Sequence, residues 1–304
     1  MIWELPEPRA VFDVELDDGS SIRVRQHGEI AGPRLFISHG NGFAADAYLP
    51  FWSRLLGRFE LLVFDFRNHG HNEPSDPAHH TYAQMARDLE RVYQDATARL
   101  GRKTSVGVFH SMSGRAAMLH AIAIGWRWDA LVLFDPPNVP PLGHPIRDAM
   151  CAFETKLTGW ARQRRARFGD PGELAAEYAA ARANRSWVDG VHDLMARAVL
   201  RRDPARGDWL LRCAPALEAS IYEAALTLDL WPDAARYGGP VKLISADPDL
   251  PYGPPTGLAN RALGAEQGYD FVAIRGTGHL LQIEKPAECV HAMVEFLASQ
   301  AIGA

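Results

Sequence analysis

Short, nearly continuous apolar runs alternate with longer helix-forming segments along the first half of this chain. The runs are expected to be strands at residues 34–38, 61–66, 106–109 and 131–134, with helices between them at residues 48–56, 82–100 and 112–125. Strands that are apolar on both sides and joined by helices form parallel sheets that are covered on both faces. The sequence therefore predicts an α/β fold with a mostly parallel sheet and helices on both faces.

Two further strands are expected near the start of the chain, at residues 11–16 and 22–26. They flank Asp17-Asp18-Gly19-Ser20, and an Asp-Gly pair between two alternating runs is a strong hairpin signal. We expect this antiparallel hairpin to form one edge of the sheet.

The alternation stops after the sixth predicted strand. A proline-rich linker at residues 136–141 is followed by predicted helices at residues 149–168, 172–184, 188–200 and 215–228, with no strand expected among them. Strands resume at residues 241–245 and 271–274, before a closing helix at residues 287–299. This division predicts a core domain of residues 1–136 and 237–304, with a helical lid, residues 137–236, inserted after the sixth strand. Such an insertion lies above the carboxyl ends of the strands, where α/β proteins bind ligands.

Ser111 stands where the apolar run at residues 106–109 changes abruptly to small and helix-forming residues. At a sharp strand-to-helix turn a serine is held in a strained conformation, and the free N–H groups of the new helix face its hydroxyl. Ser111 is therefore a candidate nucleophile, with a helix-capping serine as the alternative. Phe109 and Ser113 lie two residues to either side of it, where small residues normally let strand and helix approach closely.

A serine nucleophile needs a base, and the base needs an acid that orients it. His279 follows the predicted strand at residues 271–274, in a loop with two glycines, so we expect it to be the base. Three aspartates that follow strand ends are candidates for the acid, namely Asp249, Asp247 and Asp135.

The loop His39-Gly40-Asn41-Gly42-Phe43 follows the strand at residues 34–38, and its glycines let the backbone approach a substrate. We expect the backbone N–H of Asn41 or Gly42 to form an oxyanion hole with that of Met112, the residue after the nucleophile. A simple turn between strand and helix is the alternative.

Residues 65–75 are rich in histidine, and His79 and His80 follow closely. Imidazoles and carboxylates bind metals, but no pair here has helical ligand spacing and no cysteine is nearby. We expect a structural loop in which Asp65 pairs with Arg67, and we expect neither a metal nor a cofactor.

Together these motifs resemble those of α/β-hydrolases that have a lid and a serine nucleophile. The resemblance rests on His39-Gly40-Asn41-Gly42, Asp65-Phe66-Arg67-Asn68-His69-Gly70, His110-Ser111-Met112-Ser113-Gly114, Asp249 and Gly278-His279, which follow the family's order over nearly the whole chain. It implies the α/β-hydrolase fold and a Ser-His-Asp triad. Asp249 has the best register with the family's acid, Asp247 would suit a tighter turn, and Asp135 matches members that place the acid after an earlier strand.

Two departures from related sequences bear on this resemblance. Asn68 stands where the family usually has a glycine, and asparagine also accepts a positive φ angle. A serine at the turn, rather than an aspartate, argues against the related dehalogenases and epoxide hydrolases, whose nucleophile is a carboxylate.

The expected activity is hydrolysis of a carboxylic ester or related acyl bond through an acyl-enzyme. Carbon–carbon bond hydrolysis, lactone or thioester hydrolysis and acyl transfer can use the same triad. An alternative of a different class is a hydrolase-like ligand receptor with little turnover.

The predicted lid is rich in aromatic and in basic side chains. The aromatic ones are Phe153, Trp160, Phe168, Tyr178, Trp187, Trp209, Tyr222 and Trp231. They favour a small-molecule substrate with an apolar or aromatic acyl group, unless they only hold the lid together. Arg162, Arg164, Arg165 and Arg167 are expected to form a solvated face, with an anion-binding role as the alternative.

The 304 residues have a formal net charge of -5, which gives no reason to expect nucleic acid or an anionic membrane as a partner. No apolar segment is long enough to span a membrane, and the first residues lack the pattern of a signal peptide. Cys151, Cys213 and Cys289 are widely spaced, which favours a reducing compartment. We therefore expect a cytoplasmic protein, and the sequence leaves its oligomeric state open.

Overall fold

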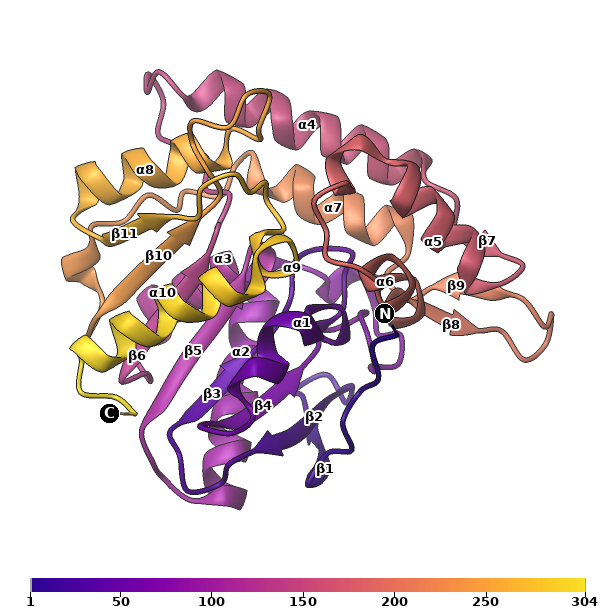
Figure 1. The fold of residues 1–304 in the computed structure, drawn as a ribbon, viewed down its shortest axis with the longest axis horizontal. Coiled ribbons are helices and arrows are strands. Elements are labelled where there is room, and N and C mark those ends of the chain that lie inside the picture. The colour runs from indigo at the N-terminus through magenta and orange to yellow at the C-terminus, as the bar shows by residue number, and fades with distance from the viewer. Residues whose placement is uncertain (1, 304) are drawn as a thin grey trace.

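An eight-stranded sheet forms the centre of the protein (Figure 1). The computed structural model describes residues 2–303. The strands of this sheet are β1 (Ala10–Glu15), β2 (Ser21–Gly28), β3 (Arg34–Ile37), β4 (Glu60–Phe64), β5 (Ser105–His110), β6 (Ala130–Phe134), β10 (Val241–Ser245) and β11 (Asp270–Ala273). Their order across the sheet is β1-β2-β4-β3-β5-β6-β10-β11. The pairs β1–β2 and β2–β4 are antiparallel and the other neighbouring strands are parallel, so the predicted mostly parallel sheet with a hairpin edge is confirmed.

Helices cover both faces of the sheet, as predicted. One face is covered by α2 (Tyr82–Leu100), α3 (Met112–Ala123) and α8 (Thr256–Gln267), and the other by α1 (Leu49–Trp52), α9 (Leu281–Glu284) and α10 (Pro286–Ser299). Alternate side chains of β5 enter the two cores: Val106 and Val108 pack with α1 and α10, whereas Phe109 packs with α2 and α3. Short 3-10 turns lie at Ala45–Tyr48, Ser53–Leu55, Pro77–His79, Arg182–Asn184 and Ala234–Arg236.

Between β6 and β10 the chain leaves the sheet and forms a segment that we call the insert, residues 137–236. Its helices are α4 (Arg147–Gln163), α5 (Pro171–Ala180), α6 (Val191–Val199) and α7 (Pro215–Ala225). Figure 1 shows α4 and α7 side by side along one side of the molecule. The insert also contains a small antiparallel sheet in the order β7 (Arg167–Phe168), β9 (Trp209–Leu211) and β8 (Leu200–Arg202). The prediction of no strand in this region is wrong, because strands of two or three residues are too short to show a period.

The three cysteines Cys151, Cys213 and Cys289 are free thiols. Within residues 2–303, no helix has both the length and the apolar character that crossing a membrane requires.

Candidate active site

Ser111 occupies a strained turn between β5 and α3. Its backbone has φ 55° and ψ −114°, in a region that residues other than glycine rarely adopt. The turn is held by Ser113, whose hydroxyl accepts a hydrogen bond from the His110 N–H and donates one to the His110 carbonyl, both at 2.9 Å. Ser113 is fully buried and its hydroxyl is used in these two bonds. Of the two serines at the turn, only Ser111 is thus left with an accessible hydroxyl.

Phe109 fits beneath this turn because its ring folds back over Gly107. A Cβ atom at Gly107 would lie 2.6 Å from Phe109 Cε2, so the glycine two residues earlier provides the space that the ring needs. The ring packs edge-on against Trp128 and Phe64, at centroid distances of 5.7 and 6.4 Å. The bulky residue therefore points into the core beside α2 and α3 and leaves the Ser111 backbone undisturbed.

His279 links Ser111 to a buried carboxylate. Its Nε2 atom lies 2.9 Å from Ser111 Oγ, and its Nδ1 atom lies 2.6 Å from Asp135 Oδ2. Since Nδ1–H donates to the carboxylate, Nε2 is left to accept the serine proton. The loop that follows β11 thus places His279 where the sequence predicts a base.

Asp135 directly follows β6 and is fully buried. Besides His279, it accepts hydrogen bonds from Ser245 Oγ (2.9 Å), the Ala246 N–H (3.0 Å), Thr256 Oγ1 (2.6 Å) and Asn260 Nδ2 (2.9 Å). Burial acts to raise the pKa of this carboxyl, but the bonds from His279 and Thr256 outweigh it and hold the pKa below its usual range. Asp135 therefore stays ionised beside the imidazole.

Asp249, the acid that the sequence favours, lies elsewhere. Its side chain is 70% exposed and pairs with Arg261 at 3.0 Å. Asp247 shapes the same loop, since it accepts hydrogen bonds from the backbone N–H groups of Gly276 (2.7 Å) and Asp249 (2.9 Å). The expectation that Asp249 orients His279 is wrong: the carboxylate belongs to Asp135, one of the two alternatives, at the end of the strand next to β5.

The loop at residues 39–43 and the start of α3 contain the backbone N–H groups that the sequence predicts for an oxyanion hole. The N–H of Gly42 donates to His69 Nε2 at 3.1 Å, so it is already used. Within residues 2–303 the N–H groups of Asn41 and Met112 have no acceptor. Gly40 lets this loop lie against the turn, because a Cβ atom there would be 3.2 Å from Ser111 Cβ. Of the two predicted alternatives, the geometry thus leaves Asn41, with Met112, free to bind an oxyanion.

A buried pair of side chains that sequence reasoning missed connects these loops. Tyr48 Oη accepts from the Gly40 N–H at 3.1 Å and donates to His110 Nδ1 at 2.8 Å. His110 Nε2 in turn donates to the His279 carbonyl at 2.8 Å, and the two imidazole rings lie 4.8 Å apart. Burial, with the charge of His279, lowers the pKa of His110 to about 3, so this ring is neutral.

The histidine-rich loop is a hydrogen-bonded structure that supports the site. Asp65 accepts from the N–H groups of Ala45 (2.7 Å) and His71 (3.0 Å), whereas Arg67 pairs with Asp88 at 2.6 Å. The expected Asp65–Arg67 pair is therefore wrong. Asn68 has the φ of 62° that its place in the motif suggested. In the described part of the chain, no three His, Cys, Asp or Glu side chains are arranged to hold a metal ion.

Comparison with known proteins identifies the family of this chain. The sequence profile of the Alpha/beta hydrolase family matches residues 35–292. The chain belongs to the alpha/beta hydrolase family.

Solved structures of hydrolases share the fold of this alpha/beta hydrolase. E-2-(Acetamidomethylene)succinate hydrolase is 19% identical, with a TM-score of 0.73 over 95% of this chain and 99% of that one. An alpha/beta hydrolase from Novosphingobium aromaticivorans is also 19% identical, with a TM-score of 0.73 over 97% and 99% of the two chains. An esterase from Exiguobacterium antarcticum is 14% identical, with a TM-score of 0.69 over 94% and 98%. At these identities the likeness shows the fold alone.

The insert of this alpha/beta hydrolase is joined to the core beside Ser111 by a buried ion pair and a hydrogen bond. Glu154 of α4 pairs with Arg115 of α3 at 2.6 Å. Asn41 Nδ2 donates to the backbone carbonyl of Glu218, on α7, at 2.7 Å. Arg164 is buried and pairs with Glu218 at 2.6 Å, so this member of the arginine cluster does not belong to a solvated face.

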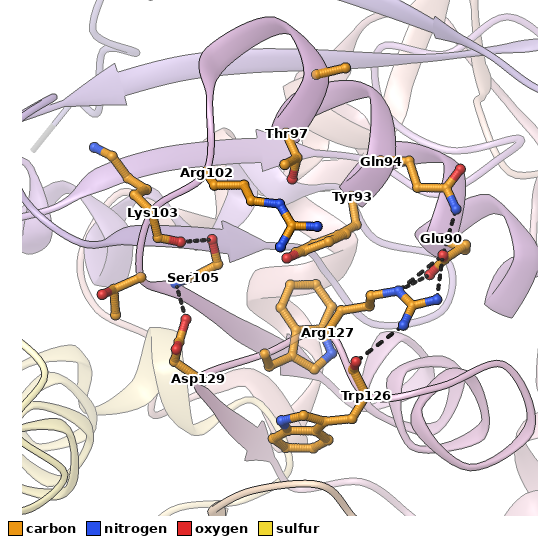
Figure 2. A pocket seen from close by; sticks show the side chains of 13 residues that line it. Glu90, Tyr93, Gln94, Thr97, Arg102, Lys103, Ser105, Trp126, Arg127 and Asp129 are labelled. Carbon is orange, nitrogen blue, oxygen red and sulfur yellow. Dashed lines mark hydrogen bonds and ion pairs between the residues drawn. The ribbon is translucent and has the colours of Figure 1, made fainter.

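A cavity of about 840 Å³ lies far from this site, between α2 and the segment that joins α3 to β6 (Figure 2). It is lined by Ser105, the first residue of β5, whereas Ser111 follows the last residue of that strand. Its walls are tied together by the ion pair of Glu90 with Arg127 at 2.9 Å. The cavity is therefore separated from Ser111 by the length of a strand.

Proposed function

We propose that this alpha/beta hydrolase is a serine hydrolase that cleaves a carboxylic ester or related acyl bond. The observation that carries the proposal is the continuous chain of contacts from Ser111 Oγ to His279 Nε2 (2.9 Å) and from His279 Nδ1 to Asp135 Oδ2 (2.6 Å). A nucleophile, a base and a buried carboxylate in this order suit acyl transfer.

In the first step His279 Nε2 takes the proton of Ser111 as the hydroxyl oxygen attacks the substrate carbonyl carbon. The N–H groups of Asn41 and Met112 stabilise the resulting oxyanion, and a donor of this kind contributes about 3 kcal/mol to the transition state. The imidazolium then gives its proton to the leaving group, which departs as an alcohol and leaves an acyl-Ser111 ester. Asp135 remains ionised and stabilises the imidazolium.

In the second step His279 removes a proton from a water molecule, which attacks the acyl-Ser111 carbonyl. The tetrahedral intermediate collapses with proton return to Ser111 Oγ, and the carboxylic acid is released. We further propose that the insert, residues 137–236, acts as a lid, because Glu154 and Glu218 place α4 and α7 against the residues that flank Ser111.

A panel of p-nitrophenyl esters, assayed with the wild-type protein and Ser111→Ala, tests the proposal. We expect the alanine to lower kcat by roughly 10⁴-fold or more. A fluorophosphonate should label Ser111, and mass spectrometry of the peptides locates the adduct. An adduct on Ser113 would contradict the assignment, and tight ligand binding without turnover would favour a receptor.

A further inference from the structure

Two buried glutamates of the insert each use only one carboxylate oxygen for an ion pair. On α7, Glu218 Oε2 pairs with Arg164 at 2.6 Å, and on α4, Glu154 Oε1 pairs with Arg115 at 2.6 Å. Both side chains are at most 2% exposed. Within residues 2–303 the other oxygens, Glu218 Oε1 and Glu154 Oε2, receive no hydrogen bond.

Glu218 lies over the loop that offers the oxyanion donor. A Cβ atom at Gly42 would be only 2.4 Å from Glu218 Oε1, so this free oxygen touches the backbone next to Asn41. The Asn41 amide fixes the same turn of α7 by its bond to the Glu218 carbonyl at 2.7 Å.

Glu154 is connected to the Ser111 turn through Arg115. Its partner Arg115 is one helical turn beyond Ser111, and the Arg115 N–H donates to the Ser111 carbonyl at 3.0 Å. Burial raises the pKa of Glu154, and the charges of Arg115 and His279 oppose this shift, so the carboxyl lies within the electrostatic reach of His279.

Tyr222 adds a third oxygen. It is one turn after Glu218 on α7, and residues four apart share a face of a helix. Its hydroxyl has no hydrogen-bond partner in the described part of the chain, although burial and the charges of Glu218 and Glu154 raise its pKa well above the usual value. The charges of both glutamates act on Tyr222 and α4 packs against α7, so the three side chains lie near one another.

These three oxygens determine what can bind there. The two arginines balance the two carboxylates, so the region has no net charge, but its unpaired atoms are hydrogen-bond acceptors and one hydroxyl. A buried acceptor that receives no hydrogen bond is unfavourable. A substrate without a donor group would leave these oxygens without a hydrogen bond. A substrate carboxylate, which is itself an acceptor, would be repelled by the free carboxylate oxygens.

We propose that Glu218, Glu154 and Tyr222 form a polar subsite that selects acyl substrates carrying an N–H or O–H donor, such as an amide, ammonium or hydroxyl group. The inference rests on the proposed function of Ser111. It replaces the expectation of an apolar or aromatic acyl group, since several aromatic side chains of the insert pack on one another or on arginines: Tyr178 lies on Trp187, Trp160 on Arg164 and Phe168 on Arg165.

The test compares p-nitrophenyl esters of matched length that end in a methyl, carboxamide, ammonium, hydroxyl or carboxylate group, namely those of heptanoic, adipamic, 6-aminohexanoic, 6-hydroxyhexanoic and adipic acid. The rate with Ser111→Ala is subtracted as background. We expect kcat/KM for at least one donor-bearing ester to exceed that for the methyl ester tenfold or more, and that for the carboxylate ester to be the lowest. Comparison of the amide, ammonium and hydroxyl esters shows which donor group the protein prefers.

The substitution Glu218→Gln replaces a hydrogen-bond acceptor of the proposed subsite by a donor. The glutamine carbonyl must face Arg164, so its NH₂ group replaces the free oxygen and turns an acceptor into a donor. We expect the ratio of kcat/KM for donor-bearing over carboxylate esters to fall at least tenfold, and Tyr222→Phe to lower it about threefold. The matched control is Glu223→Gln, on the same helix but exposed and paired with Arg162, which should leave the ratio unchanged.

Thermal melting and the rate of fluorophosphonate labelling report whether each variant keeps its fold and its reactive serine. A wild-type protein that prefers the methyl ester overturns the inference, as does a folded, normally labelled Glu218→Gln with an unchanged ratio. If that variant does not fold, an unchanged ratio in Tyr222→Phe overturns it instead. If no ester is hydrolysed, or Ser111→Ala is as active as wild type, the proposed function fails and the subsite proposal fails with it.

Discussion

His110 donates a hydrogen bond from Nε2 to the backbone carbonyl of His279, with 2.8 Å between the two atoms. Through Tyr48 the same ring is tied to the Gly40 N–H, so one buried pair of side chains connects the loops that hold Ser111, His279 and Asn41. Because none of these three loops is a helix or strand, their relative position depends on such contacts.

Removing this connection should slow catalysis more than it weakens substrate binding. We expect His110→Leu to lower kcat about 10² -fold, because small displacements of reacting groups are costly, and Tyr48→Phe to lower it less. Steady-state kinetics with an activated ester measure both effects. His291→Leu, an exposed histidine on α10, is the control. An unchanged kcat in folded His110→Leu would show that the bond does not position His279.

The choice between two aspartates can be tested directly. Asp135→Asn should lower kcat by about 10⁴-fold, because an amide cannot stabilise the imidazolium and favours the wrong tautomer. Asp249→Asn removes only an exposed pair with Arg261, so we expect activity within twofold of wild type. The reverse result would restore Asp249 as the acid.

Acid should destabilise the fold through buried histidines. Burial lowers the pKa of His27 and His80 to about 4 and that of His110 to about 3, from 6.5 in the unfolded chain. Below pH 6.5 the unfolded state binds protons that the folded state does not. The contribution of these histidines to the free energy of unfolding is therefore fully present above pH 6.5 and is lost as the pH falls toward 4. Each histidine contributes a loss of about 1.4 kcal/mol per pH unit in this window.

Urea unfolding at pH 7, 6 and 5 measures this slope. His80→Gln should reduce the slope of the free energy of unfolding against pH by the contribution of one histidine. His291→Gln, at an exposed position, should leave the slope unchanged. A free energy of unfolding that is constant from pH 7 to pH 5 would contradict the prediction.

The ion pair of Arg115 and Glu154 joins the insert to α3. Removing one partner should destabilise the protein more than removing both. Arg115→Met leaves a buried carboxylate without a cation, which we expect to cost about 4 kcal/mol. Arg115→Met combined with Glu154→Leu should recover most of this loss. Equilibrium unfolding of the two variants provides the comparison, and equal destabilisation would count against the pairing.

The sequence predicted the elements that a local pattern can reveal. The alternation of apolar runs and helices predicted the sheet and its two covered faces, and the abrupt end of β5 predicted Ser111. His279 was recognisable because it follows a strand in a glycine-rich loop. Phe109, which departs from the usual motif, is explained by Gly107 two residues earlier, and that compensation is local enough to have been visible.

Other features depend on residues that are distant in the sequence. Asp135 is distinguished from Asp249 by donors from Ser245, Thr256 and Asn260, which no local pattern connects with it. Gly42 is excluded as an oxyanion donor only because His69 folds back onto its N–H. The ion pairs of Glu154 and Glu218 join helices of the insert to residues that are distant in the sequence, so an inventory of aromatic residues could not reveal them.

The donors around Asp135 also set an order of events during synthesis. Ser111 and the loop at residues 39–43 emerge from the ribosome first, but residues 245–260 and His279 follow the entire insert. A nascent chain that ends within the insert therefore lacks His279 and the side chains that donate hydrogen bonds to Asp135. The contacts that join Ser111, His279 and Asp135 can therefore form only after the residues of β10 and β11 have been synthesised.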